Sequence, residues 1–564
     1  MKRTPLYIAL AAMSLGFASC SDDFFETSSK TSQNSETAYS NAATAEIALV
    51  GCYDGWQTTV SGEGIGMFLT SEIASDECFA GGGVGDARNY SILDRFDMGA
   101  AAGYYDLFNT DWTNYYSAIF RCNSLISNDN NGTIDWGGDE TTHGRIIGEA
   151  RGLRGLLYFD LVRLFGDVPL LTEPTDANLP RSSAAEVFQV IFDDFKYAAA
   201  NIPGASYNGT TQNTTLGRFS KYAAEALMAR AYLFYSGYYG QEPANCTKQE
   251  AIDAINDVVD NGGYALEENF ADLWMPACTE EAGVGEGNYA WNTTYAGKYY
   301  NGDTWHAGQG NISKEFVLDL SFNSTQDYNG NNDGNCFIVF TGSRNVSKAP
   351  LAPGWGIAVP NPRFVQQFDN PRMKSSVVDY ADTGFENQSD FSKCLNDTYE
   401  YTGYGIRKYA PLAFSDGTRE QVAFALGAQH TNITYYINWS IVRYADVLLM
   451  QSELTGDAKG LNLVQVRAGK VATAYSEDAL RTERAQELAF EGIRYWDLLR
   501  YGQGGTYAAQ QIKAMQDGVS VKNGGTSATT SFDESNLTSK KGLFQIPNTQ
   551  ITLSGSTLTQ NAGW

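Results

Sequence analysis

The chain has 564 residues, of which 43% are hydrophobic and 18% charged, so it can bury a large core and is not disordered as a whole. Its 39 basic and 65 acidic residues give a net charge of −26, which disfavours binding to nucleic acid and to anionic membranes but leaves uncharged ligands unaffected. Aromatic residues are 13% of the total, and tyrosine and tryptophan suit contacts with sugars or proteins.

The N-terminus has the pattern of a lipoprotein precursor. Two basic residues precede an apolar run over residues 6–17, which has the length of a signal peptide and is too short to span a bilayer. Cys20 follows two small residues, as in a bacterial lipobox. We therefore expect residues 1–19 to be a signal peptide, Cys20 to carry a lipid, and residues 20–35 to form a flexible tether. An ordinary secretory signal with a chance cysteine is the alternative.

Apolar residues then recur every three or four positions in separate blocks, which predicts amphipathic helices. These blocks cover residues 36–59, 142–165, 184–201, 217–238, 247–261, 439–455 and 478–501. Short breaks between the blocks predict stacked helix–turn–helix pairs like a degenerate tetratricopeptide array, although no clean period of about 34 residues is present. The expected fold is mainly α, with an α-hairpin (tetratricopeptide-like) scaffold over about 36–59, 104–261 and 439–502.

Helical periodicity fades between about residues 262 and 438, where glycine, asparagine, tyrosine and tryptophan become more frequent. A long irregular segment in a compact protein usually carries function. We expect a loop-rich, ligand-facing region over about 60–103 and 262–438, within a single domain that spans residues 36–564. A glycine-rich run at 81–85 matches neither dinucleotide nor phosphate-loop spacing, and we interpret it as a flexible loop close to the ligand.

Several segments carry a family resemblance. They are the start at 20–26, EARGLRGLLYFDLVRLFGDVP at 149–169, GRFSKYAAEALMARAY at 217–232, IVRYADVLLM at 441–450, ERAQELAFEGIRYWDL at 483–498 and LTQNAGW at 558–564. In this order and spacing they resemble the SusD/RagB family of outer-membrane nutrient-binding lipoproteins. The segment at 456–470 is shorter than is usual in that family.

The resemblance implies a scaffold of four tetratricopeptide-like units with a variable loop face, and no catalysis. It also implies a lipid-anchored protein at the cell surface that acts as a lid on a SusC-like TonB-dependent outer-membrane transporter. Members of the family bind oligosaccharides or, in some cases, peptides. The family signatures are scaffold residues and do not identify the ligand.

Six aromatic residues crowd into one short stretch without helical periodicity, where the average composition predicts about two. They are Tyr289, Trp291, Tyr295, Tyr299, Tyr300 and Trp305. Tyrosine and tryptophan can stack on the apolar face of a sugar ring, while neighbouring polar side chains bind its hydroxyl groups. We predict that this stretch binds the ligand. Packing of the loops onto the scaffold, or contact with the transporter, is the alternative.

Two further segments supply candidate ligand-binding residues. Trp355 lies in a loop rich in proline and glycine and is a second aromatic candidate. Asp76, Arg88, Asn89 and Tyr90 lie in the early loop and are predicted polar partners by position alone.

No pattern in the sequence requires an enzyme, a metal or a cofactor. Glu483, Glu487 and Glu491 fall on one helical face, where structural ion pairs are the favoured interpretation and the carboxylate pair of a glycoside hydrolase is the alternative. The three histidines lie far apart, and none of the eight cysteines forms a CxxC pair, so we expect mostly buried free thiols. The Asp- and Asn-rich turns at 129–132 and 329–334 leave a structural Ca²⁺ open.

The sequence therefore predicts a cell-surface glycan-binding lipoprotein that captures oligosaccharides and delivers them to a SusC-like transporter. Three alternatives stay open. They are a peptide-binding member of the same family, a surface glycoside hydrolase, and a purely structural lid.

Overall fold

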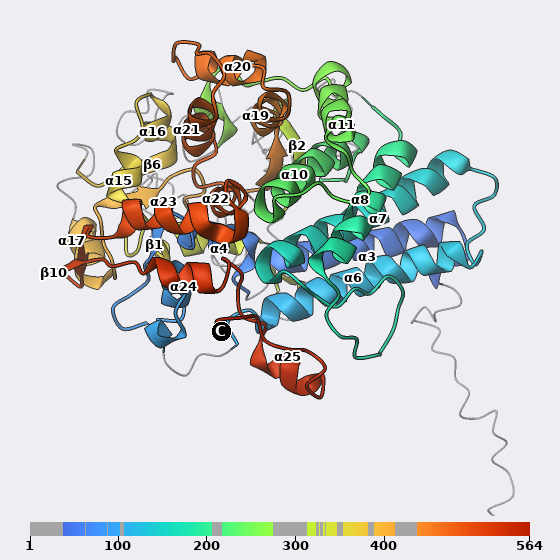
Figure 1. Ribbon diagram of the computed structural model, residues 1–564, viewed down its shortest axis with the longest axis horizontal. Coiled ribbons are helices and arrows are strands. Elements are labelled where there is room, and N and C mark those ends of the chain that lie inside the picture. Colours follow the sequence, from blue (N-terminus) through green and yellow to red (C-terminus); the bar gives the residue numbers. More distant parts are fainter. Residues whose placement is uncertain are drawn as a thin grey trace, which may run out of the picture.

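The computed structural model describes twelve segments of the chain. They are residues 38–61, 64–86, 88–101, 106–205, 217–274, 313–322, 326–327, 331–332, 334–346, 353–381, 389–411 and 437–564. These segments are mostly helical, with strands that are at most five residues long (Figure 1). The mainly α fold expected from the sequence is confirmed.

The first half of the fold is a stack of long helices. In chain order they are α3 (Ala42–Ser61), α6 (Asn109–Asn130), α7 (Glu140–Phe165), α8 (Ala184–Asn201), α10 (Lys221–Tyr239) and α11 (Lys248–Asn261). Each packs against the next along the chain, and α3 also packs against α7. Helix α6 lies in the region that we expected to be scaffold, but it was not predicted as a separate helix.

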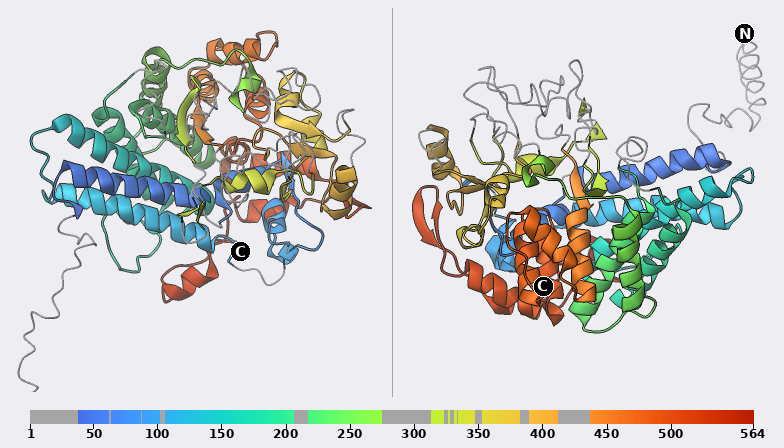
Figure 2. Two further views of the ribbon diagram at one scale, coloured as in Figure 1. Left: turned by 180° about the vertical axis from the view of Figure 1, so that it is seen from behind. Right: turned by 90° about the horizontal axis from the view of Figure 1, so that it is seen from above.

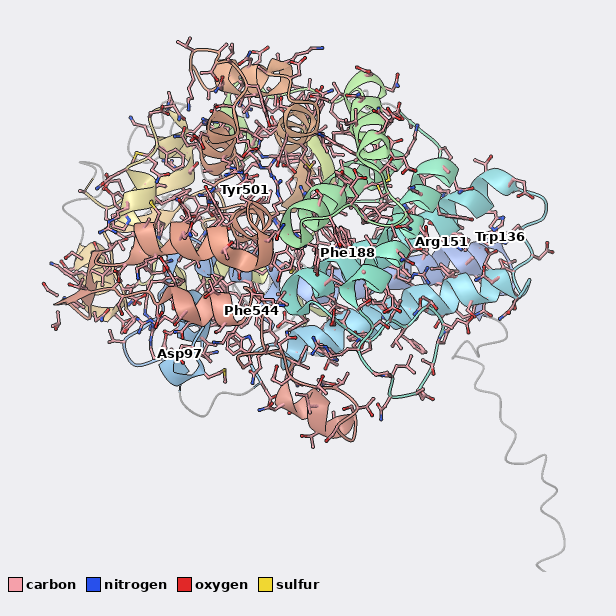
Figure 3. The ribbon with its side chains drawn as sticks, viewed as in Figure 1. Asp97, Trp136, Arg151, Phe188, Tyr501 and Phe544 are labelled. Carbon is pink, nitrogen blue, oxygen red and sulfur yellow. The ribbon has the colours of Figure 1, made fainter. Side chains whose placement is uncertain are left out.

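Local signals explain why these helices begin where they do. The Asp139 side chain accepts a hydrogen bond from the backbone N–H of Thr142 at the start of α7. Capping boxes start α8, with Ser183 and Glu186, and α11, with Thr247 and Glu250. Such caps satisfy backbone N–H groups that have no partner within the helix. Buried aromatic rings then join neighbouring helices, as where Phe188 on α8 (labelled in Figure 3) contacts α10.

The C-terminal helices complete the scaffold. They are α19 (Tyr444–Thr455), α20 (Lys459–Arg467), α21 (Glu477–Glu487), α22 (Arg494–Arg500), the turn η5 (Gln503–Gly505), α23 (Thr506–Gln516), α24 (Glu534–Ser539) and α25 (Asn548–Leu553). Helix α19 packs on α11, and α22 packs on α10, so this part continues the stack.

The predicted helix over 439–455 is wrong in its first turn, where the chain forms strand β8 (Trp439–Arg443). This strand pairs antiparallel with β2 (Phe316–Leu320), which comes from the loop-rich region more than a hundred residues earlier. The local pattern could not indicate this pairing, because the partner strand is distant in the sequence.

The predicted helix over 478–501 is interrupted between α21 and α22. Phe490 and Gly492 have φ of +59° and +79°, which is left-handed backbone. Their N–H groups cannot bond within a helix and instead donate to two buried carboxyl groups, Phe490 to Glu77 at 3.2 Å and Gly492 to Glu72 at 2.8 Å. Tertiary partners therefore stabilise a break that helix periodicity hides.

Short elements make up the described parts of the predicted loop-rich region. The helices and helical turns are α4 (Gly66–Ile73), α5 (Ser91–Arg95), η2 (Met98–Ala101), η3 (Phe270–Leu273), α14 (Cys336–Thr341), α15 (Pro362–Val365), α16 (Arg372–Ser376) and α17 (Ser389–Asp397). The paired strands are β1 (Cys78–Ala80) with β5 (Ala358–Pro360), β3 (Gln326–Asp327) with β4 (Asn331–Asn332), and β6 (Val377–Asp379) with β7 (Tyr404–Ile406). Hairpin β9 (Ser520–Asn523) and β10 (Thr526–Thr529) follows α23.

The long helices and the short elements occupy different parts of the molecule. Helices α3, α6, α7 and α8 extend to one end, and α15, α16, α17 and the β9–β10 hairpin lie at the other (Figures 1 and 2). One large apolar core cluster nevertheless runs through both parts, and in it the rings of Phe96, Tyr495 and Phe544 contact one another (Phe544 is labelled in Figure 3). The short elements that contribute to this cluster, such as α4, α5 and α14, therefore pack on the scaffold.

The cysteines and the membrane-spanning potential of the helices can be assessed only in the part of the chain that the structure describes. Its six cysteines are all buried, and Cys52, Cys78, Cys122, Cys246 and Cys394 are free thiols, as expected for most of the thiols. Within these same segments, no helix has both the length and the apolar character needed to cross a bilayer.

Candidate functional site

An open pocket of about 420 Å³ lies where β1 and β5 end. Its lining residues are Gly81, Gly82, Asp86, Asn89, Tyr90, Arg344, Trp355 and Ile357. A pocket of this volume falls in the range of small-molecule sites. Three of the residues predicted from the sequence, Asn89, Tyr90 and Trp355, are brought together here from positions more than 260 residues apart.

The floor of the pocket depends on glycine. The β1–β5 pairing continues beyond the strands, because the N–H of Gly81 donates to Ile357 and that of Gly82 donates to Gly356, both at 2.6 Å. A Cβ at Gly81 would collide with the carbonyl oxygen of Gly356. The run at 81–85, which we interpreted as a flexible loop near the ligand, therefore begins as an ordered floor on which two backbones approach closely.

Trp355 forms an aromatic wall. The amides of residues 354–357 donate hydrogen bonds to carbonyls of residues 339–343 at 2.7–2.9 Å, which fixes this loop against the end of α14. One side of the indole packs on Phe340, with 5.0 Å between ring centroids, and the side chain as a whole is 42% exposed. A rigidly held, half-exposed tryptophan can stack on an apolar ligand face at little cost in entropy.

A charged wall joins the parts of the pocket that come from distant segments. The guanidinium of Arg344 donates from Nε to Asp397 on α17 at 2.7 Å and lies 3.2 Å from Asp86 Oδ2. It also approaches the carbonyl oxygen of Trp355 at 3.4 Å. Asp86 in turn accepts a hydrogen bond from Gly83 N at 2.7 Å. Arg344 thus fixes the position of both Asp86 and the Trp355 loop.

Arg88 supports the pocket from behind. Its guanidinium donates to the carbonyl oxygens of Ala80 and Gly81 at 2.8 and 2.7 Å, and it stacks over the ring of Tyr399 at 3.4 Å. Residues 89 and 90, which follow it directly, reach the lining. Arg88 therefore acts on the shape of the pocket rather than as a lining residue.

A buried acidic pair lies under the same strand. Asp94 accepts a hydrogen bond from Ala80 N at 3.0 Å, and Glu400 forms an ion pair with Arg95 at 2.7 Å. Burial, followed by the nearby Asp94 carboxylate, raises the pKa of Glu400 to about 8, and Arg95 limits the rise. These groups hold β1 in place but do not line the pocket, whose charged lining residues are Asp86 and Arg344.

Asp76 does not lie in the pocket. Its side chain is fully buried and forms a two-point ion pair with Arg494 on α22, at 2.7 and 2.8 Å. It lies only a few residues before β1, so sequence position alone could not separate it from the lining. Asp76 connects the scaffold to the strand that builds the site.

The three glutamates predicted to share one helical face all lie in the interior, although Glu491 falls in the break between α21 and α22 and not on a helix. Glu483 contacts Arg372 at 2.7 Å, and Glu491 contacts Lys408 and Arg443 at 2.6 and 2.7 Å. The carboxylate of Glu487 is surrounded by the guanidiniums of Arg372, Arg443 and Arg467. Burial alone would raise the pKa of Glu487, but the three guanidiniums outweigh it and hold that pKa well below its usual range. The interpretation as structural ion pairs is confirmed.

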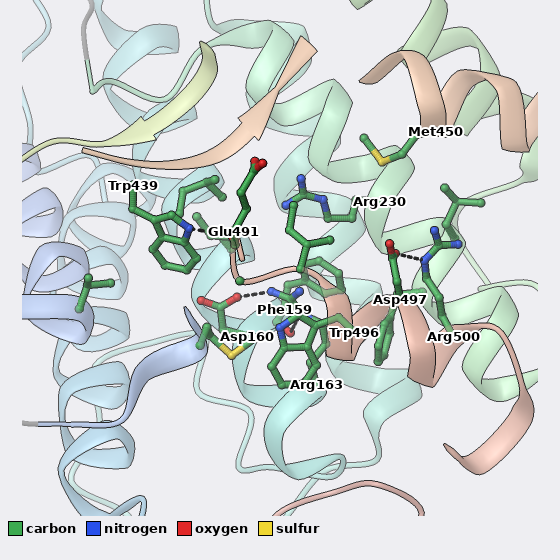
Figure 4. A pocket seen from close by; sticks show the side chains of 18 of the residues that line it. Phe159, Asp160, Arg163, Arg230, Trp439, Met450, Glu491, Trp496, Asp497 and Arg500 are labelled. Atoms are coloured by element: carbon green, nitrogen blue, oxygen red, sulfur yellow. Dashed lines mark hydrogen bonds and ion pairs between the residues drawn. The ribbon is translucent and has the colours of Figure 1, made fainter. Parts of the chain in front are cut away.

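A second hollow lies inside the scaffold (Figure 4). It encloses only about 40 Å³, enough for water and too little for a sugar ring. Aromatic side chains such as Phe159 and Trp496 line it, and some of its charged groups form ion pairs with one another, Arg163 with Asp160 and Arg500 with Asp497. This hollow is part of the core and not a candidate ligand site.

The other sequence candidates lie outside the described residues. These are the aromatic stretch with Tyr289, Trp291, Tyr295, Tyr299, Tyr300 and Trp305, and the lipidation candidate Cys20. Within the described segments, no group of three metal-ligating side chains comes together.

Sequence reasoning missed the two charged lining residues, Asp86 and Arg344, and the apolar Ile357. Asp86 directly follows the glycine run at 81–85, and a carboxylate next to backbone that must stay close-packed was a usable signal. No sequence signal indicates Arg344, because its role depends on contacts with Asp86 and Asp397 that form only in the folded protein.

Two family models match successive parts of the chain. The SusD family model matches residues 314–564, and a model described as "Starch-binding associating with outer membrane" matches residues 88–233. Among curated relatives, "SusD-like protein P38" of Formosa agariphila is 25% identical over 423 residues, which cover 69% of this chain and 71% of the relative. A "SusD-like protein" of Bacteroides ovatus is 24% identical over 529 residues, covering 88% and 82%.

Solved structures share the fold over nearly the whole length. A "Laminarin binding SusD-like protein" superposes with a TM-score of 0.67 at 23% identity, covering 93% of this chain and 100% of that one. "Surface glycan-binding protein A from Bacteroides thetaiotaomicron in complex with laminarihexaose" gives 0.68 at 18% identity, covering 92% and 99%. With the helical stack, the two successive family matches and this shared fold in hand, the chain belongs to the SusD/RagB family.

Proposed function

We propose that the protein binds a glycan at the surface of the outer membrane and passes it to a SusC-like transporter. Within the part of the chain that the structure describes, the pocket beside Trp355 is the proposed ligand-binding surface. The observation that carries the proposal is the combination in one open pocket of a half-exposed indole with a carboxylate, an amide and a phenol. A sugar ring needs an apolar face to stack on and polar groups for its hydroxyls, and this pocket offers both.

The relatives support a binding role. Five of the structural neighbours are named as laminarin-binding or surface glycan-binding proteins, and one of these was solved with laminarihexaose. The protein is not an enzyme: its relatives are named as binding proteins, and the three glutamates that could have formed a hydrolytic pair are closed off in ion pairs. The matched family description also supports association with the outer membrane.

The anchoring and the partner rest on the sequence. The lipobox-like Cys20 would hold the protein to the membrane through a lipid, and family membership supports a TonB-dependent transporter as the partner. The aromatic stretch over 289–305 would add a second stacking surface to the same ligand.

The test combines a glycan array with a peptide panel, followed by calorimetry on the best ligand. We expect an oligosaccharide to bind and Trp355→Ala to weaken its affinity by about 10-fold or more, since aromatic stacking contributes about 1 kcal/mol or more beyond its buried area. Trp136→Ala is the matched control, because Trp136 is a partly buried tryptophan at the α6–α7 turn (Figure 3).

Equal affinities of the wild type and Trp355→Ala for that glycan would reject this pocket. Binding of peptides without any glycan would favour the peptide-binding alternative. A protein that binds the transporter but no soluble ligand would favour the structural lid.

A further inference from the structure

The charges that line the pocket are unbalanced. Among the described residues, only two charged side chains belong to the lining, Asp86 and Arg344. The guanidinium of Arg344 is already committed, because Asp397 accepts from its Nε and Asp86 lies beside its terminal nitrogen. One cation thus faces two carboxylates, and the wall carries an excess negative charge.

Asp86 still has capacity to bind a ligand. One carboxylate oxygen, Oδ2, accepts from Gly83 N and contacts Arg344, while Oδ1 has no hydrogen-bond partner in the described segments. The side chain is 51% exposed and belongs to the lining of the pocket, so a ligand there can reach it. A carboxylate only accepts hydrogen bonds at neutral pH, so it selects groups that donate, such as sugar hydroxyls.

Arg88, the other nearby cation, does not offset this charge towards the ligand. Its guanidinium is covered by two backbone carbonyls and by the face of Tyr399. Among the residues that the structure describes, an incoming carboxylate or sulfate would therefore meet Asp86 without a free cation in the lining, in a protein whose net charge is already −26.

We propose that Asp86 makes this pocket selective for uncharged glycans, by accepting hydrogen bonds from ligand hydroxyls and by repelling uronic acid and sulfate groups. The proposal rests on the glycan-binding function given above. It assigns Asp86 direct contact with the ligand and Arg344 the role of a positioning residue that holds Asp86 beside Trp355.

The experiment compares paired probes, a neutral oligosaccharide found on the array and the same oligosaccharide after oxidation of its C6 groups to uronic acids. The wild type is expected to prefer the neutral probe by at least about 10-fold, with an affinity that changes little between low and high salt. Asp86→Asn is expected to weaken binding of the neutral probe by about 10-fold, because a charge-assisted hydrogen bond is lost, and to reduce the preference for it.

Asp253→Asn on α11 is the control, because it removes the same charge from an exposed helix face outside the pocket. It should leave both affinities unchanged. Tighter binding of the acidic probe by the wild type, or an unchanged preference in Asp86→Asn, would overturn this proposal and leave the glycan-binding function standing. Failure to bind any glycan would overturn both.

Discussion

Replacement of Glu72 by glutamine tests how the scaffold holds the strand that builds the pocket. Glu72 lies in the last turn of α4, a few residues before β1. Its Oε1 accepts a hydrogen bond from the backbone N–H of Gly492, in the break between α21 and α22. Its side chain is fully buried, and so is that of Glu77. Burial, followed by the charge of Glu72, raises the pKa of Glu77 well above its ordinary value, so the pair of carboxyl groups keeps a proton.

The structure sets the expected magnitude. Burial raises the pKa of Glu72 from its ordinary 4.5 to about 7. The folded protein therefore binds the proton more tightly than the unfolded chain, and stability falls as the pH rises from about 4.5 to about 7. At about 1.4 kcal/mol per pKa unit, the loss between acidic pH and pH 8 is at most about 3.5 kcal/mol, most of it above pH 5. Above pH 7 this contribution no longer changes.

Glu72→Gln should remove this penalty, because the amide keeps an acceptor for Gly492 and can donate to Glu77 in place of the proton. Guanidinium chloride unfolding at pH 5 and pH 8, followed by tryptophan fluorescence, measures the difference in unfolding free energy between variant and wild type. This difference should favour the variant more at pH 8, by up to about 3 kcal/mol. Glu477→Gln, on an exposed face of α21, is the control. A difference that is the same at both pH values would refute the reasoning.

Two further substitutions test the pocket floor and the buried charges. Gly81→Ala drives a Cβ against the carbonyl oxygen of Gly356 and should cost about 1–3 kcal/mol and weaken glycan binding. Gly85→Ala is its control, since a Cβ there meets nothing within 4 Å, and equal thermal unfolding of the two variants would argue against the close-packed floor. Glu487→Gln leaves three buried guanidiniums short of a carboxylate and should lower the free energy of unfolding by about 3–5 kcal/mol. A cost below about 1 kcal/mol in chemical denaturation would show that the remaining carboxylates compensate.

Helices with strong local signals could be predicted from the sequence. The predicted span 184–201 is the span of α8, and the predicted 142–165 differs from α7 only in its first two residues. Both helices combine an apolar face with a cap of their own, at Ser183 and Asp139. Such signals act within a few residues, so they can be read without knowing the fold.

The errors occur where partners are distant in the sequence. Residues 439–443 become a strand because β2 lies beside them. Residues 488–493 leave the helix because Glu72 and Glu77, more than 400 residues earlier, accept the released N–H groups. In both places the local pattern was compatible with a helix, and the tertiary contact decided the outcome.

For the site, the chemistry of the candidate residues could be predicted from the sequence, but their positions in the fold could not. The sequence by itself determined which side chains suit a sugar, among them Trp355, Asn89 and Tyr90, and it determined the helical family scaffold. Only the tertiary structure decided that these three meet at the end of β1–β5 with Asp86 and Arg344, and that Asp76 is buried against Arg494. The physical reason is that stacking and hydrogen-bonding capacity belong to single side chains, whereas burial and proximity arise only when distant segments pack together.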